Sequence, residues 1–297
     1  MSDAKPDAVS GVPYLVTLVA TETVSDAMLR RASETCMDHG GAEIASSRGD
    51  ERMATIRATM IDCDGLTAAL EAVLPDVDVI VRPADMRPRL FVADMDSTMI
   101  TVECIDELAD FAGLKAEVSA VTEAAMRGEL DFEAALRERV ALLAGLEERA
   151  IAACLDQRVR STAGAASLLR ALRSSGVRCV LVSGGFTAFA EPVGNMLGFD
   201  RVVANVLEIS DGVLTGRLAG PVVDGMTKRH VLEEELASLA VSAGHAIAIG
   251  DGANDLHMVK AAGLGVAYHA KPALAEKADA RIRPVDLTVL ERALSAA

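Results

Sequence analysis

Acidic residues follow two short apolar runs that lie far apart in this chain. The first run, residues 90–93, leads into Asp94 and Asp96. The second run, residues 246–250, leads into Asp251. Short apolar runs of this kind predict buried strands, and carboxylates at buried strand ends cost folding free energy unless a cation or a substrate uses them. The pattern therefore predicts one divalent metal site that the fold assembles from two distant segments.

Four pieces of the chain, in this order, resemble the motifs of the haloacid dehalogenase-like phosphotransferases. The segment 94–98 (Asp-Met-Asp-Ser-Thr) resembles the family's nucleophile motif, and 180–185 resembles its second motif, a strand that ends in Ser or Thr. Lys228 resembles the basic third motif, and 250–255 (Gly-Asp-Gly-Ala-Asn-Asp) resembles the acidic fourth motif. The ordered set is far more specific than any one of its pieces.

Each piece taken alone also has a plain structural interpretation. Asp96 and Thr98 fit the cap of a following helix. Ser183 with its two glycines fits a strand-to-helix turn, Lys228 fits a helix start, and Asp251 fits a turn. The order of all four pieces favours a functional site over these readings.

The resemblance implies an α/β fold with a Rossmann-like parallel-sheet core and an inserted helical cap. It also implies hydrolysis of a phosphate monoester through an aspartyl-phosphate. In that chemistry Asp94 would be the nucleophile, and Asp96 the general acid and then the general base. Ser183 and the amide of Gly184 would hold phosphoryl oxygens, and Lys228 would neutralise their charge.

The resemblance further implies Mg²⁺, a hard ion that binds carboxylate and phosphate oxygens. Asp94 and Asp251 would bind it through their side chains, and Asp96 through its backbone carbonyl. Asp255 would support the metal through water. Asn254 is expected to contact the phosphate or to order the basic residue of the third motif.

Within the family, the closest resemblance is to the phosphoserine phosphatases. Glu103 matches the acid that binds the substrate ammonium in those enzymes, and Arg139 matches the arginine that binds the substrate carboxylate. Phe132 and Met126 would line the lid. Without the resemblance, Arg139 fits a surface ion pair with a nearby glutamate on an amphipathic helix.

The resemblance thus implies a Mg²⁺-dependent phosphoserine phosphatase that catalyses the last step of serine biosynthesis. Two alternatives stay open at this point. One is the same chemistry on another phosphorylated amino acid, such as phosphohomoserine. The other is a non-catalytic regulatory protein that senses amino acids, against which the intact set of motif residues argues.

Net charge limits the classes of binding partner that can be expected, and cysteine content indicates the redox state of the compartment. The 297 residues carry 29 basic and 44 acidic side chains, a net charge of −15. Nucleic acids and anionic membranes require basic surfaces, so neither is expected as a partner. Five scattered cysteines without metal-binding spacing indicate a reducing, cytoplasmic compartment. A homodimer and an amino-acid effector of the N-terminal module stay open.

The pattern of apolar residues predicts two domains. Residues 1–12 form a tail, 13–82 a ferredoxin-like domain that resembles an ACT module, and 83–89 a linker. Residues 90–297 form the phosphatase domain, with the cap at about 102–164. The elements expected in the first domain are strands at 14–20, 42–47, 53–61 and 77–81 and helices at 25–39 and 64–73, the β-α-β-β-α-β order.

Overall fold

The chain divides into two compact units in the computed structural model, and each unit is described by itself. The residues described are 11–60, 63, 65–126, 131–283 and 285–295. The first unit comprises residues 1–87, 279–285 and 292–297, and the second comprises 88–278 and 286–291.

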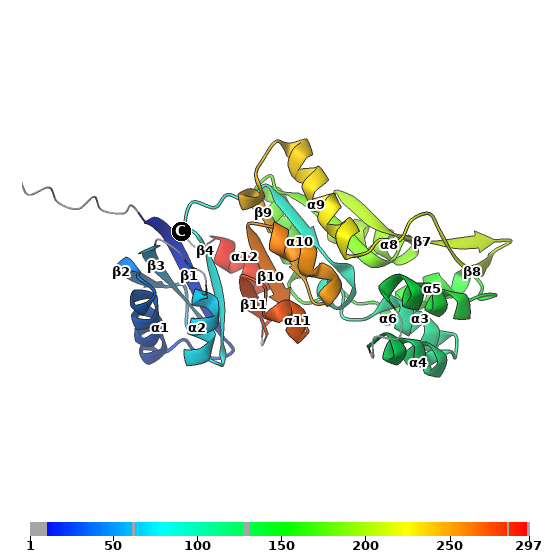
Figure 1. The fold of residues 1–297 in the computed structure, drawn as a ribbon, viewed down its shortest axis with the longest axis horizontal. Coiled ribbons are helices and arrows are strands. Elements are labelled where there is room, and N and C mark those ends of the chain that lie inside the picture. Colours follow the sequence, from blue (N-terminus) through cyan, green and yellow to red (C-terminus); the bar gives the residue numbers. More distant parts are fainter. Residues whose placement is uncertain (1–10, 61–62, 64, 127–130, 284, 296–297) are drawn as a thin grey trace, which may run out of the picture. The chain divides into compact units, whose positions relative to one another are not determined.

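The first unit is an antiparallel sheet covered on one face by two helices (Figure 1). Its elements follow the predicted β-α-β-β-α-β order: β1 (Val12–Ala20), α1 (Asp26–Asp38), β2 (Ala42–Arg48), β3 (Met53–Met60), α2 (Leu66–Val73) and β4 (Val77–Pro83). Alternate residues of β1, including Val16 and Leu18, are buried in one cluster with Ala32 and Cys36 of α1. The strand order is β2-β3-β1-β4, with one further strand beyond β4.

That further strand, β11 (Ala280–Ile282), comes from the far end of the sequence and was not predicted. It pairs antiparallel with β4. Arg283 follows it and binds the fully buried Asp78, whose Oδ2 accepts from the Arg283 backbone at 2.9 Å and whose Oδ1 lies 3.2 Å from Nε. Arg281 pairs with the buried Glu71 at 2.9 Å. Charged residues of the C-terminal segment thus neutralise acids that are buried in this unit, one on β4 and one on α2.

The second unit is a parallel sheet with strand order β10-β9-β5-β6-β7 and an antiparallel edge strand, β8. This confirms the predicted α/β core. The strands are β5 (Leu90–Ala93), β6 (Arg178–Phe186), β7 (Arg201–Ser210), β8 (Val213–Ala219), β9 (Ala246–Gly250) and β10 (Leu264–Tyr268). The helices outside the cap are α7 (Ala165–Ser174), α8 (Thr187–Leu197), α9 (Gly225–Leu239), α10 (Leu256–Ala261) and α11 (Pro272–Ala275). The last helix, α12 (Thr288–Ser295), begins in this unit and ends in the first.

The predicted helical cap is inserted after β5. It consists of α3 (Cys104–Phe111), α4 (Lys115–Met126), α5 (Phe132–Leu142) and α6 (Arg149–Arg158). The β7–β8 hairpin lies beside it (Figure 1). Leu214 of β8 exchanges backbone hydrogen bonds with Gly145 and Leu146, each 2.8 Å long. Asp211 and Gly212 turn this hairpin with φ of 53° and 77°, the left-handed pair of a type I′ turn. The hairpin therefore braces the end of α5.

None of the helices in the described part of the chain combines the length and apolar character needed to cross a bilayer.

The buried acid under the C-terminal segment yields a stability prediction. Replacing Arg283 by Leu leaves the carboxylate of Asp78 buried without its cation, and we expect the free energy of unfolding to fall by about 2–3 kcal/mol. Urea denaturation of the full chain measures this. Arg292→Leu is the matched control, because its partner Asp50 is exposed and the loss should stay below about 1 kcal/mol. Equal losses in both variants would contradict the prediction.

Candidate active site

The two acidic segments meet because their strands are neighbours in the sheet. β5 and β9 run parallel, with Ala93 opposite Ile249. The backbone amide of Asp94 donates to the carbonyl of Ile249 at 3.0 Å. Since both strands end at the same edge, Asp94 and Asp251 lie together, as the sequence predicted.

A buried lysine joins the two segments to α9. The Nζ of Lys228 lies 2.7 Å from Asp94 Oδ1 and 2.7 Å from Asp255 Oδ1. Lys228 and Asp255 are fully buried, and Asp94 nearly so. Burial by itself lowers the pKa of Lys228, but Asp255 and Asp94 outweigh it and raise that pKa, so the ammonium stays charged.

Asp255 also fixes the loop that follows β9. Its Oδ2 accepts hydrogen bonds from the backbone amides of Asp251 at 3.1 Å and Gly252 at 3.0 Å. A Cβ on Gly250 would stand 2.3 Å from the Asp255 Cγ, so only glycine lets the carboxylate lie so close to the chain. Both oxygens of Asp255 are therefore engaged within the protein.

Three carboxylates are close enough to share a cation. One oxygen from each of Asp94, Asp251 and Asp255 lies within 4.8 Å of the others. Burial raises the pKa of Asp251 to about 6; the negative charge of Asp255 adds to this rise, and the positive charge of Lys271 opposes it. Thr98 is fully buried, with Oγ1 3.5 Å from Asp251 Oδ1. Among the described residues the Asp251 carboxylate has no ion-pair partner and Asp94 has Lys228 alone, so negative charge remains for a hard divalent ion.

Asp96 follows Asp94 by two positions, and two donors hold its carboxylate in place. Its Oδ1 accepts from the amide of Cys104 at 3.0 Å, and the hydroxyl of Ser183 approaches Oδ2 at 3.5 Å. Burial, and then the charge of Glu103, raise the pKa of Asp96 to about 7. A Cβ on Gly185 would stand 2.7 Å from Oδ2, so this glycine makes room for the carboxylate. Asp96 is suited to exchange a proton near neutral pH.

The end of β6 supplies polar groups at the same edge. Ser183 is fully buried, and its hydroxyl accepts from the amide of Gly185 at 2.8 Å. Asn205 of β7 ties this turn to the loop before α9, donating to the carbonyl of Gly184 and accepting from the amide of Val223, each at 2.8 Å. The turn is thus held by side chains on both sides.

Glu103 is positioned by a residue that the motif analysis did not single out. Ser97 donates from its hydroxyl to Glu103 Oε1 at 2.7 Å. Its φ is 52°, a left-handed backbone conformation that is costly for a residue with a Cβ. The strained turn directs the serine hydroxyl at the glutamate.

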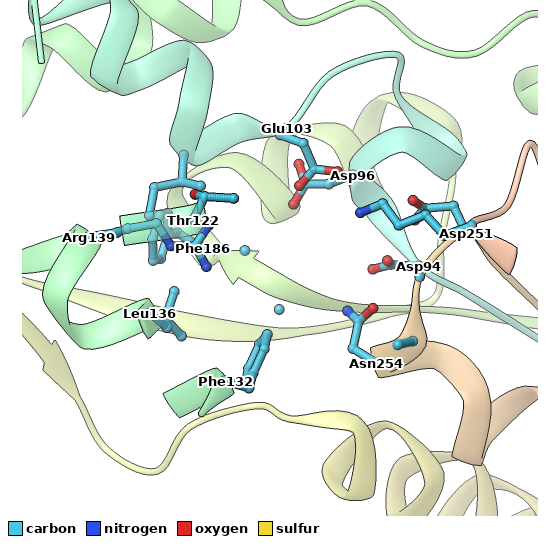
Figure 2. Close-up of a pocket in the computed structure, with 16 residues that line it drawn as sticks. Asp94, Asp96, Glu103, Thr122, Phe132, Leu136, Arg139, Phe186, Asp251 and Asn254 are labelled. Carbon is cyan, nitrogen blue, oxygen red and sulfur yellow. The ribbon is translucent and has the colours of Figure 1, made fainter. Parts of the chain in front are cut away.

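These groups line one cavity of about 440 Å³. Figure 2 shows Arg139, Leu136 and Thr122 on the cap side and Asp94, Asp251 and Asn254 on the core side. The predicted residues on its wall are Asp94, Asp96, Glu103, Phe132, Arg139, Gly184, Asp251 and Asn254. Lys228, Ser183 and Asp255 are buried behind that wall. Met126 ends α4, and its side chain lies outside the described part of the structure.

The cavity also has wall residues that sequence reasoning missed, among them Thr122, Leu136 and Lys271. Their spacing carries no signal that separates them from ordinary helix and loop residues. The hypothesis that Arg139 forms a surface ion pair does not describe this structure. Its neighbour Arg137 makes that pair, with Glu133 at 2.7 Å, while Arg139 bonds the Ala135 carbonyl at 3.3 Å and faces the cavity.

Comparisons with known proteins agree with this geometry. A family model described as haloacid dehalogenase-like hydrolase matches residues 91–260. A phosphoserine phosphatase of Polaromonas sp. is 50% identical over 195 residues, which cover 64% of this chain and 83% of that protein.

Solved structures are similar as well. A probable phosphoserine phosphatase from Vibrio cholerae, in unliganded form, has 32% identity and a TM-score of 0.74, covering 96% of this chain and 86% of that chain. A phospho-aspartyl intermediate analogue of phosphoserine phosphatase has 38% identity and a TM-score of 0.65, covering 69% of this chain and 98% of that chain. The resemblance that the motifs predicted is confirmed.

The proximity of two carboxylates yields a titration prediction for the metal-free protein. Burial and then the negative charge of Glu103 raise the pKa of Asp96 to about 7, and Glu103→Gln removes the second of these causes. We expect that pKa to fall, so that less Asp96 is protonated at neutral pH. Carbon-13 NMR of the side-chain carboxyl groups measures the change. Glu107→Gln, on the same helix but paired with Arg158 at 3.3 Å, should leave Asp96 unchanged. An unaltered Asp96 titration in Glu103→Gln would refute the coupling.

Proposed function

This chain belongs to the haloacid dehalogenase-like hydrolase family, and we propose that it is a Mg²⁺-dependent phosphatase that hydrolyses O-phospho-L-serine to L-serine and phosphate. One observation carries the proposal. A single cavity joins the Asp94 and Asp96 pair on its core wall to Glu103 and Arg139 near the cap. The first pair suits phosphoryl transfer, and the second matches the two charged groups of an amino acid. The similarity to phosphoserine phosphatases supports the same substrate.

The reaction starts with attack of Asp94 on phosphorus. A bond forms between its carboxylate and phosphorus, and the ester P–O bond breaks. Asp96 gives its proton to the departing serine oxygen, which its raised pKa permits. Water then attacks phosphorus while Asp96 takes its proton. The bond between Asp94 and phosphorus breaks, which releases phosphate and restores the Asp94 carboxylate.

Charge neutralisation comes from groups around the nucleophile. Lys228 holds Asp94 in place and offsets the charge of the phosphoryl group. Asp94, Asp251 and the Asp96 backbone carbonyl would hold Mg²⁺, which would supply further positive charge to offset the negative charge of the phosphoryl group. Asp255 would act on the metal through water. Its own oxygens are taken by Lys228 and two amides.

The remaining polar groups would bind the rest of the substrate. Ser183 and the Gly184 amide would hold phosphoryl oxygens, with Asn254 beside them. Arg139 would bind the substrate carboxylate, since a guanidinium can fork onto two oxygens. Glu103 would bind the ammonium.

The first unit is proposed to be an ACT-like module that binds an amino-acid effector, supported by its strand order β2-β3-β1-β4. We further propose that the enzyme acts in the cytoplasm, in serine biosynthesis, and that it forms a homodimer.

Phosphate release from phosphoserine, phosphohomoserine, phosphothreonine and phosphoethanolamine, assayed side by side, tests the substrate. One methylene is worth about 1–3 kcal/mol of discrimination, so phosphohomoserine is the demanding comparison.

The nucleophile assignment predicts that Asp94→Asn abolishes turnover, because an amide does not attack phosphorus. Wild-type enzyme quenched during turnover should carry a phosphoryl group on Asp94, detectable by mass spectrometry of the peptide. A chelator should stop turnover reversibly. Substantial phosphate release by the variant, with no phosphopeptide from the wild type, would sink the covalent mechanism.

The cap assignment predicts a substrate-selective effect. Removing one partner of a desolvated charge pair costs about 2–5 kcal/mol, so Arg139→Ala should lower kcat/KM for phosphoserine by about 30-fold or more. Phosphoethanolamine, which lacks the carboxylate, should lose far less. Arg137→Ala is the matched control, because it lies on the same helix and pairs with exposed Glu133. Equal losses on both substrates would mean that Arg139 supports the cap generally.

A further inference from the structure

The cavity walls carry more negative than positive charge. Four carboxylates line them, from Asp94, Asp96, Glu103 and Asp251. The proposed substrate is itself a net anion, and the whole chain carries a net charge of −15. An anion that enters such a cavity needs a cation exposed on its path.

Two cationic side chains line the cavity among the described residues, Arg139 and Lys271. Lys228 is fully buried and already bound to two carboxylates, so it cannot attract a substrate from solution. Arg139 lies on α5, where the proposed function gives it the substrate carboxylate. Lys271 has no role in the chemistry described above.

The backbone holds Lys271 beside the acidic loop. Its amide donates to the carbonyl of Asp251 at 2.9 Å. Its own carbonyl accepts from the amides of Leu274 and Ala275 at 3.1 and 3.0 Å, which fixes it at the start of α11. Within the described residues its ammonium has no salt-bridge partner. The backbone thus anchors a charged, exposed side chain at the core wall, and within the described residues this side chain forms no salt bridge.

We propose that Lys271 captures the phosphate group of the incoming substrate and guides it to the core wall of the cavity. This inference rests on the proposed function, since it concerns the same site. Lys271 would act on the dianion before Lys228 and the metal engage it. With Arg139 on the cap wall, the two cations would orient the substrate with phosphate toward the core and carboxylate toward the cap.

The role has an electrostatic signature that a structural role lacks. A positive charge beside Asp251 attracts an anion but opposes a divalent cation at the same loop. Removing it should therefore weaken phosphate binding and strengthen Mg²⁺ binding. Damage to the loop would weaken both.

The kinetic test compares Lys271→Gln with Lys277→Gln. Lys277 is exposed in the same segment and does not line the cavity. One exposed charge should raise KM for phosphoserine about two- to fivefold in Lys271→Gln, with kcat retained. The difference from wild type should shrink in high salt, because the Debye length falls from about 10 Å at 0.1 M to about 3 Å at 1 M. Lys271→Arg should restore KM, and Lys277→Gln should behave as wild type.

A binding test is independent of turnover. Calorimetric titration of the full chain with inorganic phosphate, in the presence of Mg²⁺, and separately with Mg²⁺ alone, should show opposite changes in Lys271→Gln. Loss of both affinities, or no change in either, would overturn the inference. If the wild type hydrolyses no phosphoserine, the proposed function fails, while the two titrations still decide whether Lys271 captures a phosphate.

Discussion

A lysine ammonium removed entirely from water must be matched by carboxylates, and the rest of this site depends on how Lys228 is matched. Asp94 directly follows β5, Asp255 follows β9, and Lys228 lies in α9. The two contacts of 2.7 Å fix these three elements around one charge. Because the pairs are buried, removing any partner would leave an uncompensated charge. The ion pairs that stabilise this part of the fold therefore also position the nucleophile Asp94.

This arrangement leaves the site with more carboxylates than one lysine can neutralise. Asp251 and Asp96 keep raised pKa values because burial, and then a neighbouring acid, disfavour their charged forms. The close packing of carboxylates against backbone also dictates glycine nearby. A Cβ would lie 2.3 Å from Asp255 at Gly250 and 2.7 Å from Asp96 at Gly185. These glycines are therefore required because any side chain would collide with a carboxylate.

The strands that carry the chemistry were predictable because apolar runs end directly in polar residues, as at Asp94 and Ser183. The order of elements in both units followed from the same local patterns. Local sequence patterns did not predict the contacts between residues that lie far apart in the sequence. β11 joins the first sheet from the end of the chain, and Asp78 meets Arg283 across more than two hundred positions. The spacing of apolar residues within a segment does not show which distant segment it pairs with. For this reason the sequence analysis assigned residues 279–285 to the phosphatase domain.

Substrate specificity near the cap depends on Glu103 and Arg139, which hydrogen bonds hold in place but which have no ion-pair partner in the described residues. Ser97 has a left-handed backbone conformation and donates a hydrogen bond to one oxygen of Glu103. Arg139 donates one hydrogen bond to the Ala135 carbonyl. Burial lowers the pKa of Arg139, while Asp106 and Glu103 oppose this, so the guanidinium stays charged without an ion-pair partner in the described residues. Leaving a half-buried charge unpaired costs stability. Binding of an anion to Arg139 offsets this loss of free energy. An amino-acid substrate, whose carboxylate and ammonium can pair with Arg139 and Glu103 together, should offset more of it than a simple phosphate does.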